Sequence, residues 1–432
     1  MPHTEPQSGR PDGVPGMVLK HMPAGYHDAL QRLFQAMSFT GITPPAWLNS
    51  HTILLYKKGD PVTIDNYRPI TLANALYKLW TTCIVMLATD YIEGRKILSP
   101  EQEGFRTARS CSRAITHLGL CVEDAHTHKK DIVLCYLDFK GAFPSADHAQ
   151  LARTLNFLEL PEDFINIITN LYEGATTEFV TPHGHTPPIG IRRGTLQGDP
   201  LSPLLFDLMI EPLIRWLNAS QKGYDITSCG LRLTSKWYAD DGTLVTNTVD
   251  DMITLLDIVE QFSDWSGIRL NVGKCKITAY IQGLQSIKKI KDRDDALKAR
   301  LAHVAIGDRR IGVLSQDEPL PGGYLGTALT ASLCPDAHLR WTKQQLELIC
   351  KAVTRAPLPS QIQQRLLLYG AHSKINHTHC LMALSPSSMA EVDSILEGTT
   401  RKIWHLPNTF PRAGLHATAD ELGLNIPTIW ED

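Results

Sequence analysis

The stretch Trp237-Tyr238-Ala239-Asp240-Asp241-Gly242 decides the fold of this chain. Residues 231–238 and 243–246, on either side of it, have the residue pattern of strands. An Asp-Gly pair between two such runs predicts a hairpin, because its turn needs residues that tolerate positive φ. Two adjacent carboxylates at a hairpin tip repel each other, and a divalent cation that prefers oxygen ligands, such as Mg²⁺, is the usual remedy. The alternative is a solvated turn that contains two acids.

A third acid follows a segment that is typical of a buried strand. Residues 131–137 form a nearly continuous apolar run, which predicts a strand buried on both faces, and Asp138 comes directly after it. A carboxylate in that place is costly unless it is paired or bound to a metal. Three clustered carboxylates can hold two Mg²⁺ ions about 4 Å apart, the arrangement that clamps an in-line phosphoryl displacement. Because side chains alternate along a strand, we expect one of Asp240 and Asp241 to be a principal ligand and the other a secondary one.

A loop with two glycines, residues 193–200, precedes a predicted helix over residues 201–217. Asp199 is suited to the N-cap of this helix and Pro200 to its first position. A helix N-terminus with a glycine-bearing loop suits a phosphate or a nucleotide, although most junctions of this kind are structural. Ser145 is expected to cap an earlier helix.

The composition is that of an ordinary globular protein. The 432 residues, 43% hydrophobic and 20% charged, suffice for two or three domains. No apolar run approaches the ~20 residues of a membrane-spanning helix, and residues 1–10 lack the apolar core of a secretory signal. We therefore expect an intracellular protein, nuclear or cytoplasmic, without a membrane partner.

The net charge of −3 is low for a protein that binds nucleic acid, because phosphate contacts favour a basic surface. The basic residues form local clusters, which can line a groove on a neutral protein. Each cluster by itself is more typical of a solvated face. The clusters are Lys57 and Lys58; Arg106, Arg109 and Arg113; Lys129 and Lys130; Arg192 and Arg193; and Lys288, Lys289 and Lys291.

The cysteines favour a reducing compartment and give no metal motif. There are 9 of them, an odd number, and no C-x-x-C pair. One cluster of potential metal ligands stands out, namely His372, His377, His379 and Cys380. No second cluster completes a zinc site, so a polar stretch beside a helix is the favoured interpretation.

The ordered motifs resemble those of the reverse transcriptases of non-LTR (LINE-like) retrotransposons, from about Gly9 to the C-terminus. The segments in the first half are Lys57-Lys58-Gly59-Asp60, Asn66-Tyr67-Arg68-Pro69-Ile70, Gln102-Glu103-Gly104-Phe105-Arg106 and Leu137-Asp138 through Phe143. Those in the second half are Leu196-Gln197-Gly198-Asp199-Pro200, Tyr238-Ala239-Asp240-Asp241, Gly267 through Lys276, and Tyr324-Leu325-Gly326.

This resemblance implies an α+β fold of the right-hand polymerase type, with fingers, an antiparallel-sheet palm and a helical thumb. The implied divisions are a flexible lead-in at 1–16, an N-terminal extension and fingers at 17–130, a palm at 131–334, and a helical thumb with a C-terminal segment at 335–432. Within the palm, residues 179–198 would form a fingers/palm loop and residues 284–320 an insertion.

The implied activity is that of an RNA-directed DNA polymerase, a nucleotidyltransferase that extends a primer 3′-hydroxyl with deoxynucleotides. The cofactors would be two Mg²⁺ ions, with Mn²⁺ as an alternative. The resemblance makes Asp138 and Asp240 the main metal ligands and Asp241 a secondary one. It makes Lys274 the proton donor to pyrophosphate, with Lys276 as the alternative.

Further residues are assigned to substrates by the same resemblance. Phe143 matches the bulky residue that blocks a ribose 2′-hydroxyl, and Arg68 can engage phosphate with two hydrogen bonds. For Phe143 and Tyr324 the alternative is a plain core aromatic. The nucleotide-binding set is Lys57, Arg68, Phe143, Gln197 and Gly198, and the primer and template set is Arg106, Tyr238, Tyr324 and Gly326.

The implied partners are an RNA template, a DNA primer and deoxynucleotides. The family's polyprotein carries an endonuclease that nicks the target, and often Cys/His knuckles, and neither is visible here. Integration would need an endonuclease supplied elsewhere, and the chain has the extent of an excised domain or a truncated copy. The segment Glu421-Leu422-Gly423-Leu424 resembles the family's glycine-rich close but lacks its paired glycines.

Three other interpretations remain open. A viral RNA-dependent RNA polymerase shares the palm, although Phe143 and Gln197 argue against it. Group II intron and retron enzymes are close relatives, but they are less favoured because the Asn-Tyr-Arg-Pro-Ile segment and the C-terminal pattern resemble those of LINE-like enzymes. The third is a non-catalytic, nucleic-acid-binding remnant of a retroelement, since a truncated copy need not be active.

Overall fold

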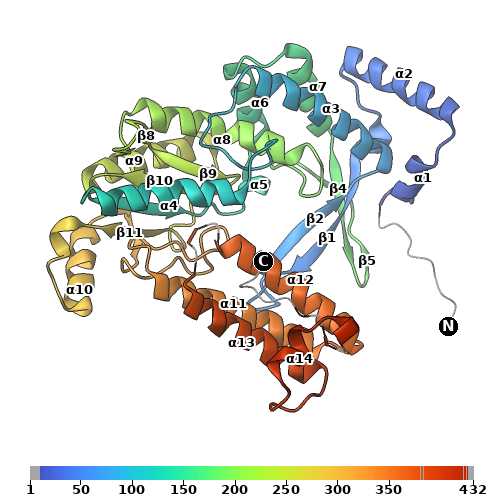
Figure 1. Cartoon of the computed structure of the whole chain (residues 1–432). Coiled ribbons are helices and arrows are strands. Elements are labelled where there is room, and N and C mark those ends of the chain that lie inside the picture. Colours follow the sequence, from blue (N-terminus) through green and yellow to red (C-terminus); the bar gives the residue numbers. More distant parts are fainter. Residues whose placement is uncertain (1–9, 380, 383, 422, 425, 427–432) are drawn as a thin grey trace.

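The centre of the structure is a five-stranded sheet, with the strand order β14-β11-β3-β10-β9 (Figure 1). The computed structural model describes residues 10–379, 381–382, 384–421, 423–424 and 426. All neighbouring strands of this sheet are antiparallel except β14, which pairs with β11 in parallel. The strands are β3 (Ile132–Leu137), β9 (Ser235–Tyr238), β10 (Asp241–Thr246), β11 (Lys276–Tyr280) and β14 (Gly312–Val313).

Helices cover both faces of this sheet, which explains the apolar run. All six residues of β3 are buried, as predicted. Because side chains alternate along a strand, Cys135 and its i±2 neighbours pack into one core with α8 and α9, while Leu134 and its i±2 neighbours join a second core with α4. These helices are α4 (Cys111–Thr127), α8 (Ser202–Ala219) and α9 (Val249–Ser266).

The start of α8 differs from the prediction. The helix begins at Ser202 and not at Pro200. Asp199 belongs to the preceding turn, where its Oδ1 accepts a hydrogen bond from the N–H of Leu201 at 3.3 Å. Its Oδ2 accepts one from the hydroxyl of Tyr77 at 3.1 Å. The buried partner Tyr77 thus holds Asp199 in the loop, so that Asp199 lies outside the helix that it was expected to cap.

The predicted cap at Ser145 is also wrong. Asp147 caps α6 (His148–Phe157), because its Oδ1 accepts from the N–H groups of the second and third following residues at 3.0 and 3.2 Å. Ser145 ends the short helix α5 (Ala142–Ser145), and its hydroxyl donates to the carbonyl of Gly141 at 2.7 Å.

A second sheet lies beside the first, with the strand order β2-β1-β4-β5 and with β6 paired to β4 (Figure 1). Strands β1 and β2 form an antiparallel pair, while β1 and β4 are parallel. The strands are β1 (Asn49–Tyr56), β2 (Tyr67–Leu72), β4 (Thr176–Thr181), β5 (Gly184–His185) and β6 (Ile189–Gly190). Helices α2 (Ala24–Thr40), α3 (Ala75–Gly94) and α7 (Glu162–Tyr172) accompany this part of the chain.

Three helices form a bundle near the C-terminus (Figure 1). They are α11 (Pro335–Arg355), α12 (Ser360–His379) and α13 (Pro386–Ile403). Leu346, Leu367 and Val392, one from each helix, meet in a separate core. No helix within the described residues is long and apolar enough to cross a membrane.

The lead-in expected at residues 1–16 is partly ordered. Residues 1–9 lie outside the described part. Gly16 begins α1 (Gly16–Lys20), and the Oδ2 of Asp12 accepts a hydrogen bond from the N–H of Ala75 at 2.8 Å. The segment from Arg10 onward is therefore attached to the start of α3, because Asp12 satisfies a backbone N–H that the first turn of a helix leaves free.

The remaining elements are short or peripheral. They are η1 (Pro45–Trp47), η2 (Ile64–Asn66), β7 (Tyr224–Asp225), β8 (Arg232–Leu233), η3 (Gln282–Leu284), α10 (Ile290–Leu301), β12 (Ala305–Ile306), β13 (Arg309–Arg310), α14 (Arg412–His416) and η4 (Ala419–Glu421).

Candidate active site

The predicted hairpin exists, but its turn lies two residues earlier than expected. Asp241 pairs with Tyr238, so the loop between β9 and β10 consists of Ala239 and Asp240. Ala239 supplies the positive φ, at 54°. Gly242 is already in β10, and a Cβ on it would lie 2.3 Å from the ring of Trp237. Glycine is needed at 242 for space against that buried ring, and the Asp-Gly pair is not the turn.

The strand register brings the third acid to this tip. Gly242 pairs with Leu137 across the antiparallel strands β10 and β3. Asp241 and Asp138 are therefore the next residues along these two strands. Burial and the charge of Asp138 raise the pKa of Asp240. Asp241 is at an exposed position at the start of β10. Desolvation of its carboxylate, together with the charges of Asp240 and Asp138, nevertheless raises the pKa of Asp241 to about 6. Three carboxylates therefore share one electrostatic site.

Asp138 has one basic neighbour. Its Oδ2 is buried and has no hydrogen-bond partner among the described residues, and the exposed Lys274 places its Nζ 3.7 Å from that atom. The Nζ of Lys276, the alternative to Lys274, donates to the carbonyl of Gly273 at 3.3 Å. Of the two candidate lysines, the structure brings Lys274 to the acids.

A pocket opens beside Asp240. Arg68, Phe143, Gln197 and Gly198 line it together with Asp240. The positive charge of Arg68 lowers the pKa of Asp240, against the larger effect of burial. The Oε1 of Gln197 is buried and has no hydrogen-bond partner among the described residues. This part of the predicted nucleotide set is therefore gathered around one of the acids.

Two backbone features shape that pocket. Gly198 has a φ of 113°, and a Cβ there would lie 2.6 Å from the carbonyl oxygen of Thr71. The carbonyl of Gln197 accepts a hydrogen bond from the N–H of Thr71 at 2.6 Å. Because only glycine fits both the conformation and the space, the loop before α8 can lie directly against β2, which carries Arg68.

Phe143 is half-buried at the wall of the pocket. Its ring stacks on that of Phe206 at a centroid distance of 4.6 Å and meets the edge of Phe105 at 6.5 Å. Phe105 lies in turn 6.2 Å from the ring of Tyr238. The Phe143 side chain is thus both a packed aromatic and a pocket residue, held by the rings of Phe206 and Phe105.

Two predicted residues, Lys57 and Tyr324, lie elsewhere. Lys57 is exposed at the turn after β1 and is not among the residues that line the pocket. Tyr324 is 3% exposed, and its ring packs 5.8 Å from that of Tyr136 in the core under the sheet. The turn after Tyr324 is partly exposed, and there the Nζ of Lys374 donates to the carbonyl of Gly326 at 2.8 Å. Tyr324 itself is a core aromatic.

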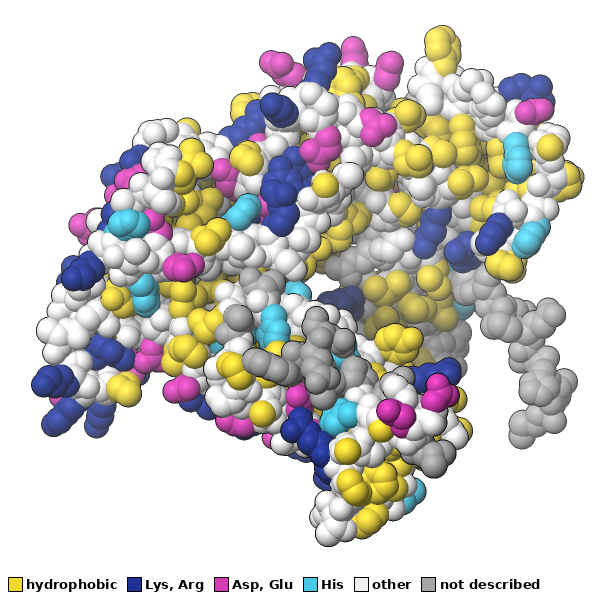
Figure 2. All heavy atoms as spheres, in the orientation of Figure 1, with side chains coloured by type: hydrophobic (Ala, Val, Ile, Leu, Met, Phe, Trp, Pro, Cys, Tyr) yellow, Lys and Arg dark blue, Asp and Glu magenta, His cyan; other side chains and the backbone are white. Residues whose placement is uncertain are grey.

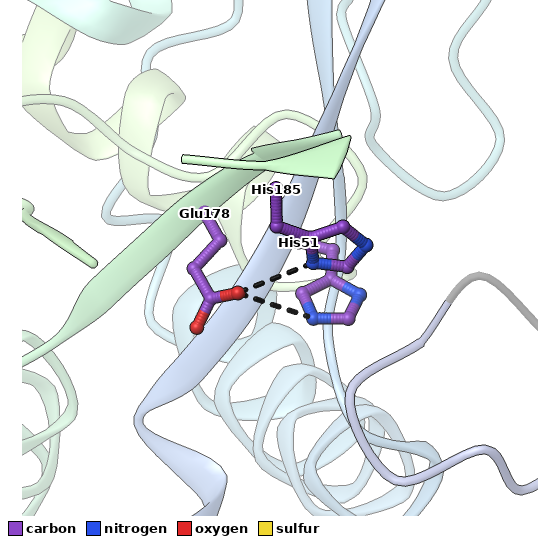
Figure 3. Close-up of side chains that lie close together, drawn as sticks. All are labelled: His51, Glu178 and His185. Atoms are coloured by element: carbon purple, nitrogen blue, oxygen red, sulfur yellow. Dashed lines mark hydrogen bonds and ion pairs between the residues drawn. The ribbon is translucent and has the colours of Figure 1, made fainter. Parts of the chain in front are cut away.

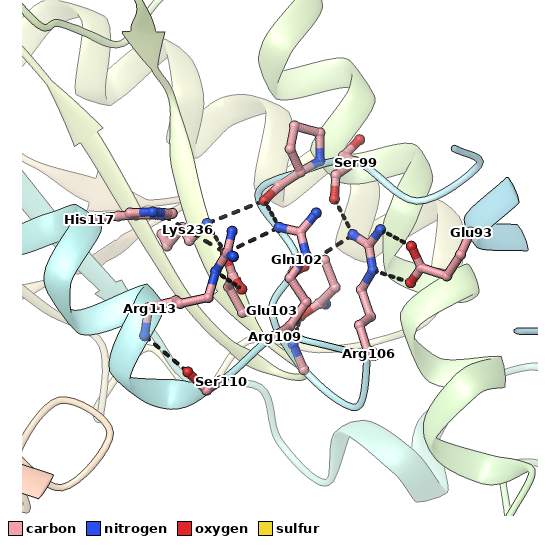
Figure 4. A network of polar contacts seen from close by, with 12 residues as sticks. Glu93, Ser99, Gln102, Glu103, Arg106, Arg109, Ser110, Arg113, His117 and Lys236 are labelled. Carbon is pink, nitrogen blue, oxygen red and sulfur yellow. Dashed lines mark hydrogen bonds and ion pairs between the residues drawn. The ribbon is translucent and has the colours of Figure 1, made fainter. Parts of the chain in front are cut away.

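Arg106 has a structural role in place of the expected contact with primer or template. Its side chain is 5% exposed, and its guanidinium forms two 2.8 Å hydrogen bonds to the carboxylate of Glu93. It also donates to the carbonyls of Ser99 at 2.6 Å and Gln102 at 3.1 Å. Figure 4 shows these contacts of Arg106, which lies in the loop before α4. Because four of the five guanidinium N–H groups are engaged inside the protein and the side chain is buried, Arg106 has little to offer a nucleic acid.

The basic cluster of Arg106, Arg109 and Arg113 forms ion pairs with Glu93 and Glu103, although the Arg113 side chain remains 48% exposed. Glu103 is completely buried, and Lys236, Arg109 and Arg113 all lie within 3.3 Å of its carboxylate (Figure 4). Arg106 and Arg109 are therefore engaged within the protein, whereas Arg113 remains exposed. Figure 2 shows the Lys and Arg side chains of one face spread among acidic ones, with a group over α10.

Gln102 is a site residue that sequence reasoning missed. Its Oε1 accepts hydrogen bonds from the N–H groups of Ala239 and Gly104, both at 2.9 Å, and its Nε2 donates to the carbonyl of Ala239 at 3.3 Å. Trp237 exchanges backbone hydrogen bonds with the residues on either side of Gln102. The motif around Gln102 was visible in the sequence, but no signal indicated that it holds the hairpin tip.

His372, His377 and His379, interpreted from the sequence as a polar stretch beside a helix, lie toward the end of α12. The Nε2 of His377 lies 2.6 Å from the carbonyl oxygen of Leu325, in the turn that precedes the thumb helices. Cys380 lies outside the described residues, as does Leu422 of the C-terminal segment.

The palm carboxylates, in contrast, fit divalent cations. Asp138 keeps a buried carboxylate oxygen free of hydrogen bonds within the described structure, and desolvation together with like charges raises the pKa of Asp241. A cation would relieve both effects, and oxygen donors of this kind suit Mg²⁺ or Mn²⁺.

Comparison with known proteins gives a consistent result. Residues 56–329, well over half of the chain, match the family described as reverse transcriptase (RNA-dependent DNA polymerase). The Pol polyprotein of retrotransposable element R2DM from Drosophila melanogaster is 26% identical over 97% of this chain and 38% of its own length. The Pol polyprotein of retrotransposable element R2 from Popillia japonica is 26% identical over 89% of this chain and 52% of its own length. The chain thus spans about half or less of each relative.

Among solved structures, apo telomerase from Candida tropicalis matches with a TM-score of 0.45 and 10% identity, over 89% of this chain and 68% of the telomerase. The family match and the helix-covered antiparallel sheet confirm the expected α+β right-hand polymerase fold. The retrotransposon relatives confirm the resemblance to non-LTR enzymes. The chain belongs to the reverse transcriptase (RNA-dependent DNA polymerase) family.

Proposed function

We propose that this chain is an RNA-directed DNA polymerase that extends a primer 3′-hydroxyl with deoxynucleotides. The observation that carries the proposal is the meeting of Asp138, Asp240 and Asp241 beside a pocket lined by Arg68 and Gln197. Three acids at adjoining strand ends, next to a nucleotide-sized pocket, suit phosphoryl transfer.

Asp138 and Asp240 would hold the metal ions, and Asp241 would support them. The family generally depends on divalent metals, and the oxygen donor set favours two Mg²⁺ ions, with Mn²⁺ as an alternative. Divalent cations bound there supply charge neutralisation to a triphosphate and lower the pKa of an attacking hydroxyl.

The chain's own residues would orient the nucleotide. Arg68 is exposed, and its charge acts on Asp240, which supports a role in binding phosphate. Gln197 offers a buried Oε1 without a protein partner among the described residues, which supports a hydrogen bond to the nucleotide. Gly198 lets the loop approach β2 and so keeps the pocket narrow. Phe143 would exclude a ribose 2′-hydroxyl.

Proton transfer and primer binding are assigned to other residues. Lys274 would protonate the leaving pyrophosphate, a role supported by the 3.7 Å between its Nζ and Asp138. Tyr238 and the turn at Gly326 would contact the primer: Tyr238 ends β9 directly before the Ala239–Asp240 loop, and the turn follows Tyr324, whose ring packs against Tyr136 of β3. Lys57 could contribute only a peripheral phosphate contact, because it is exposed outside the pocket.

The partners would be an RNA template and a nucleic-acid primer, held between fingers (17–130), palm (131–334) and thumb (335–432). We propose a DNA primer and deoxynucleotides as the preferred substrates. The chain spans 38% and 52% of the length of these two relatives, and we propose that any integration into a target would use an endonuclease supplied elsewhere.

Primer extension on an RNA template with Mg²⁺ and deoxynucleotides tests the proposal. The wild type and an Asp257→Ala variant, which changes an exposed acid on α9, should extend the primer, whereas Asp240→Ala should lower the rate by several orders of magnitude. If the wild type binds the duplex but never extends it, the chain is a non-catalytic remnant. Extension by Asp240→Ala at the wild-type rate would refute the assigned site, and a preference for ribonucleotides would indicate an RNA polymerase.

A further inference from the structure

A compact His/Glu group lies in the second sheet, on strands that the proposed polymerase site does not use. His51 on β1 is the register partner of Glu178 on the parallel strand β4. His185 on β5 pairs with Val180, two residues after Glu178. Because side chains alternate along strands, this register places all three side chains on one face of the sheet. Figure 3 shows both imidazoles turned toward the carboxylate.

The three potential ligand atoms are close together. The Oε2 of Glu178 lies 3.2 Å from the Nδ1 of His185 and 4.0 Å from the Nε2 of His51. The two imidazole rings meet edge to face at a centroid distance of 4.6 Å. All three ligand atoms lie within 4.8 Å of one another. Ligands at ~2.0–2.1 Å from a tetrahedral zinc are roughly 3.4 Å apart, so small side-chain rotations suffice to enclose an ion.

We propose that His51, Glu178 and His185 form a Zn²⁺ site, independent of the Mg²⁺ site proposed in the palm. Two imidazoles with one carboxylate are a donor set that prefers zinc or a similar transition metal, whereas an all-oxygen set prefers Mg²⁺. The exposed fraction of the side chains increases from His51 (14%) through Glu178 (21%) to His185 (43%). The site is therefore open on the His185 side, where an ion can enter and water can fill the fourth position.

A neighbouring amide orients the carboxylate. The Nδ2 of Asn49 donates to the Oε1 of Glu178 at 3.4 Å, which leaves Oε2 for the histidines. Outer hydrogen bonds of this kind fix metal-binding carboxylates. A bound ion would join β1, β4 and β5 through their side chains, and so fasten the 181–185 hairpin to the sheet whose strand β2 carries Arg68.

The test is titration of the full-length protein with Zn²⁺ in competition with a chromophoric chelator. One equivalent of Zn²⁺ should bind to this site, and an excess of Mg²⁺ should not displace it. Affinity should fall by more than 10-fold in His51→Ala, Glu178→Ala and His185→Ala, and by about 10-fold in Asn49→Ala, whose side chain only orients a ligand.

Two matched variants separate this site from others. His183→Ala removes an exposed histidine from the same hairpin and should leave Zn²⁺ affinity unchanged. Asp240→Asn alters the palm acids and should also retain the ion. Co²⁺ bound to the wild type should show the visible absorption of a four-coordinate ion, and His185→Ala should abolish it. Because His185 is exposed, its removal should leave the circular dichroism spectrum unchanged.

Two results would overturn the proposal. One is the absence of a Zn²⁺ equivalent in the wild type. The other is equal Zn²⁺ affinity in the wild type and in a folded His185→Ala variant, which would mean that the three side chains form only a hydrogen-bonded His/Glu group.

Discussion

The side-chain amide of Gln102 hydrogen-bonds to both the N–H and the carbonyl of Ala239, the residue that precedes Asp240. Gln102 is fully buried and lies 137 residues away from Ala239 in the chain. Ala239 has a positive φ of 54°, which an L-residue adopts at a cost. The amide therefore stabilises the one backbone conformation that aims Asp240 at Asp138. Gln102 is a positioning residue.

Replacing Gln102 should impair the positioning of Asp240 without weakening the binding of deoxynucleotides. In Gln102→Leu, the N–H groups of Ala239 and Gly104 lose their acceptor, which costs about 1–3 kcal/mol for each buried group. We expect kcat of primer extension to fall about 10- to 100-fold with little change in KM for deoxynucleotides, because a small displacement of a catalytic group is costly. Steady-state kinetics measure both constants.

The control is Gln285→Leu, which removes an amide that donates to the carbonyl of Ile281 at 3.0 Å on the far edge of the sheet. It should reduce stability without changing kcat. A Gln102→Leu enzyme with unaltered kcat would show that the hairpin keeps its conformation unaided.

Gly242→Ala should destabilise the palm. The new Cβ would lie 2.3 Å from the ring of Trp237, which is completely buried and cannot yield. We expect a loss of about 1–3 kcal/mol in the free energy of unfolding, as for other overpacked cores. Gly398→Ala is the matched control, since a Cβ there meets no atom within 4 Å. It lies inside α13 and should raise stability by about 0.5–1 kcal/mol. Urea unfolding measures the free energy of unfolding, which should fall in Gly242→Ala and rise in Gly398→Ala.

Lys236 and Glu103 form a buried ion pair, and removing Glu103 should destabilise the protein more than removing Lys236. Glu103→Leu leaves the Lys236 side chain, 2% exposed, its hydrogen bond to the carbonyl of Pro100 at 3.2 Å but removes its carboxylate partner, and should cost about 3–5 kcal/mol. Lys236→Met should cost less, because Arg109 and Arg113 still neutralise Glu103. The double variant should regain much of the loss. Equal losses in the two single variants, measured by urea unfolding, would contradict this order.

Phe143→Ala should relax sugar selection. Removing the ring opens the pocket wall beside Gln197, so a ribose 2′-hydroxyl can be accommodated. We expect the ratio of kcat/KM for deoxynucleotides over ribonucleotides to fall at least 10-fold. Phe157→Ala, which truncates a 62% exposed ring at the end of α6, should keep the wild-type ratio. An unchanged ratio in Phe143→Ala would leave this residue as a packing aromatic alone.

His338 should make the thumb sensitive to acid. Burial and the neighbouring His379 lower the pKa of His338 to about 4. Since its unfolded value is higher, the unfolded chain binds more protons between about pH 6.5 and 4, and the stabilisation falls as pH decreases across that window. The loss amounts to at most about 3 kcal/mol. His338→Leu should flatten the pH profile of unfolding in this range, and His303→Leu, at an exposed position, should not.

Local signals in the sequence determined much of this structure. The apolar run before Asp138 predicted a strand buried on both faces, and β3 is such a strand. The ordered acids predicted a polymerase, and the family match bears out that prediction. These predictions succeeded because burial periodicity and strand ends depend on neighbouring residues, which a single sequence displays.

Only the tertiary structure decided the contacts between distant segments. The loop of the hairpin is Ala239–Asp240 because Trp237 fills the space at Gly242. Arg106 faces Glu93, not a nucleic acid. The Gln102 amide reaches Ala239, and His185 reaches Glu178, only through the packing and register of strands far apart in the chain. A residue's type limits what it can bind, but its partners are set by which segments the fold brings within hydrogen-bond distance.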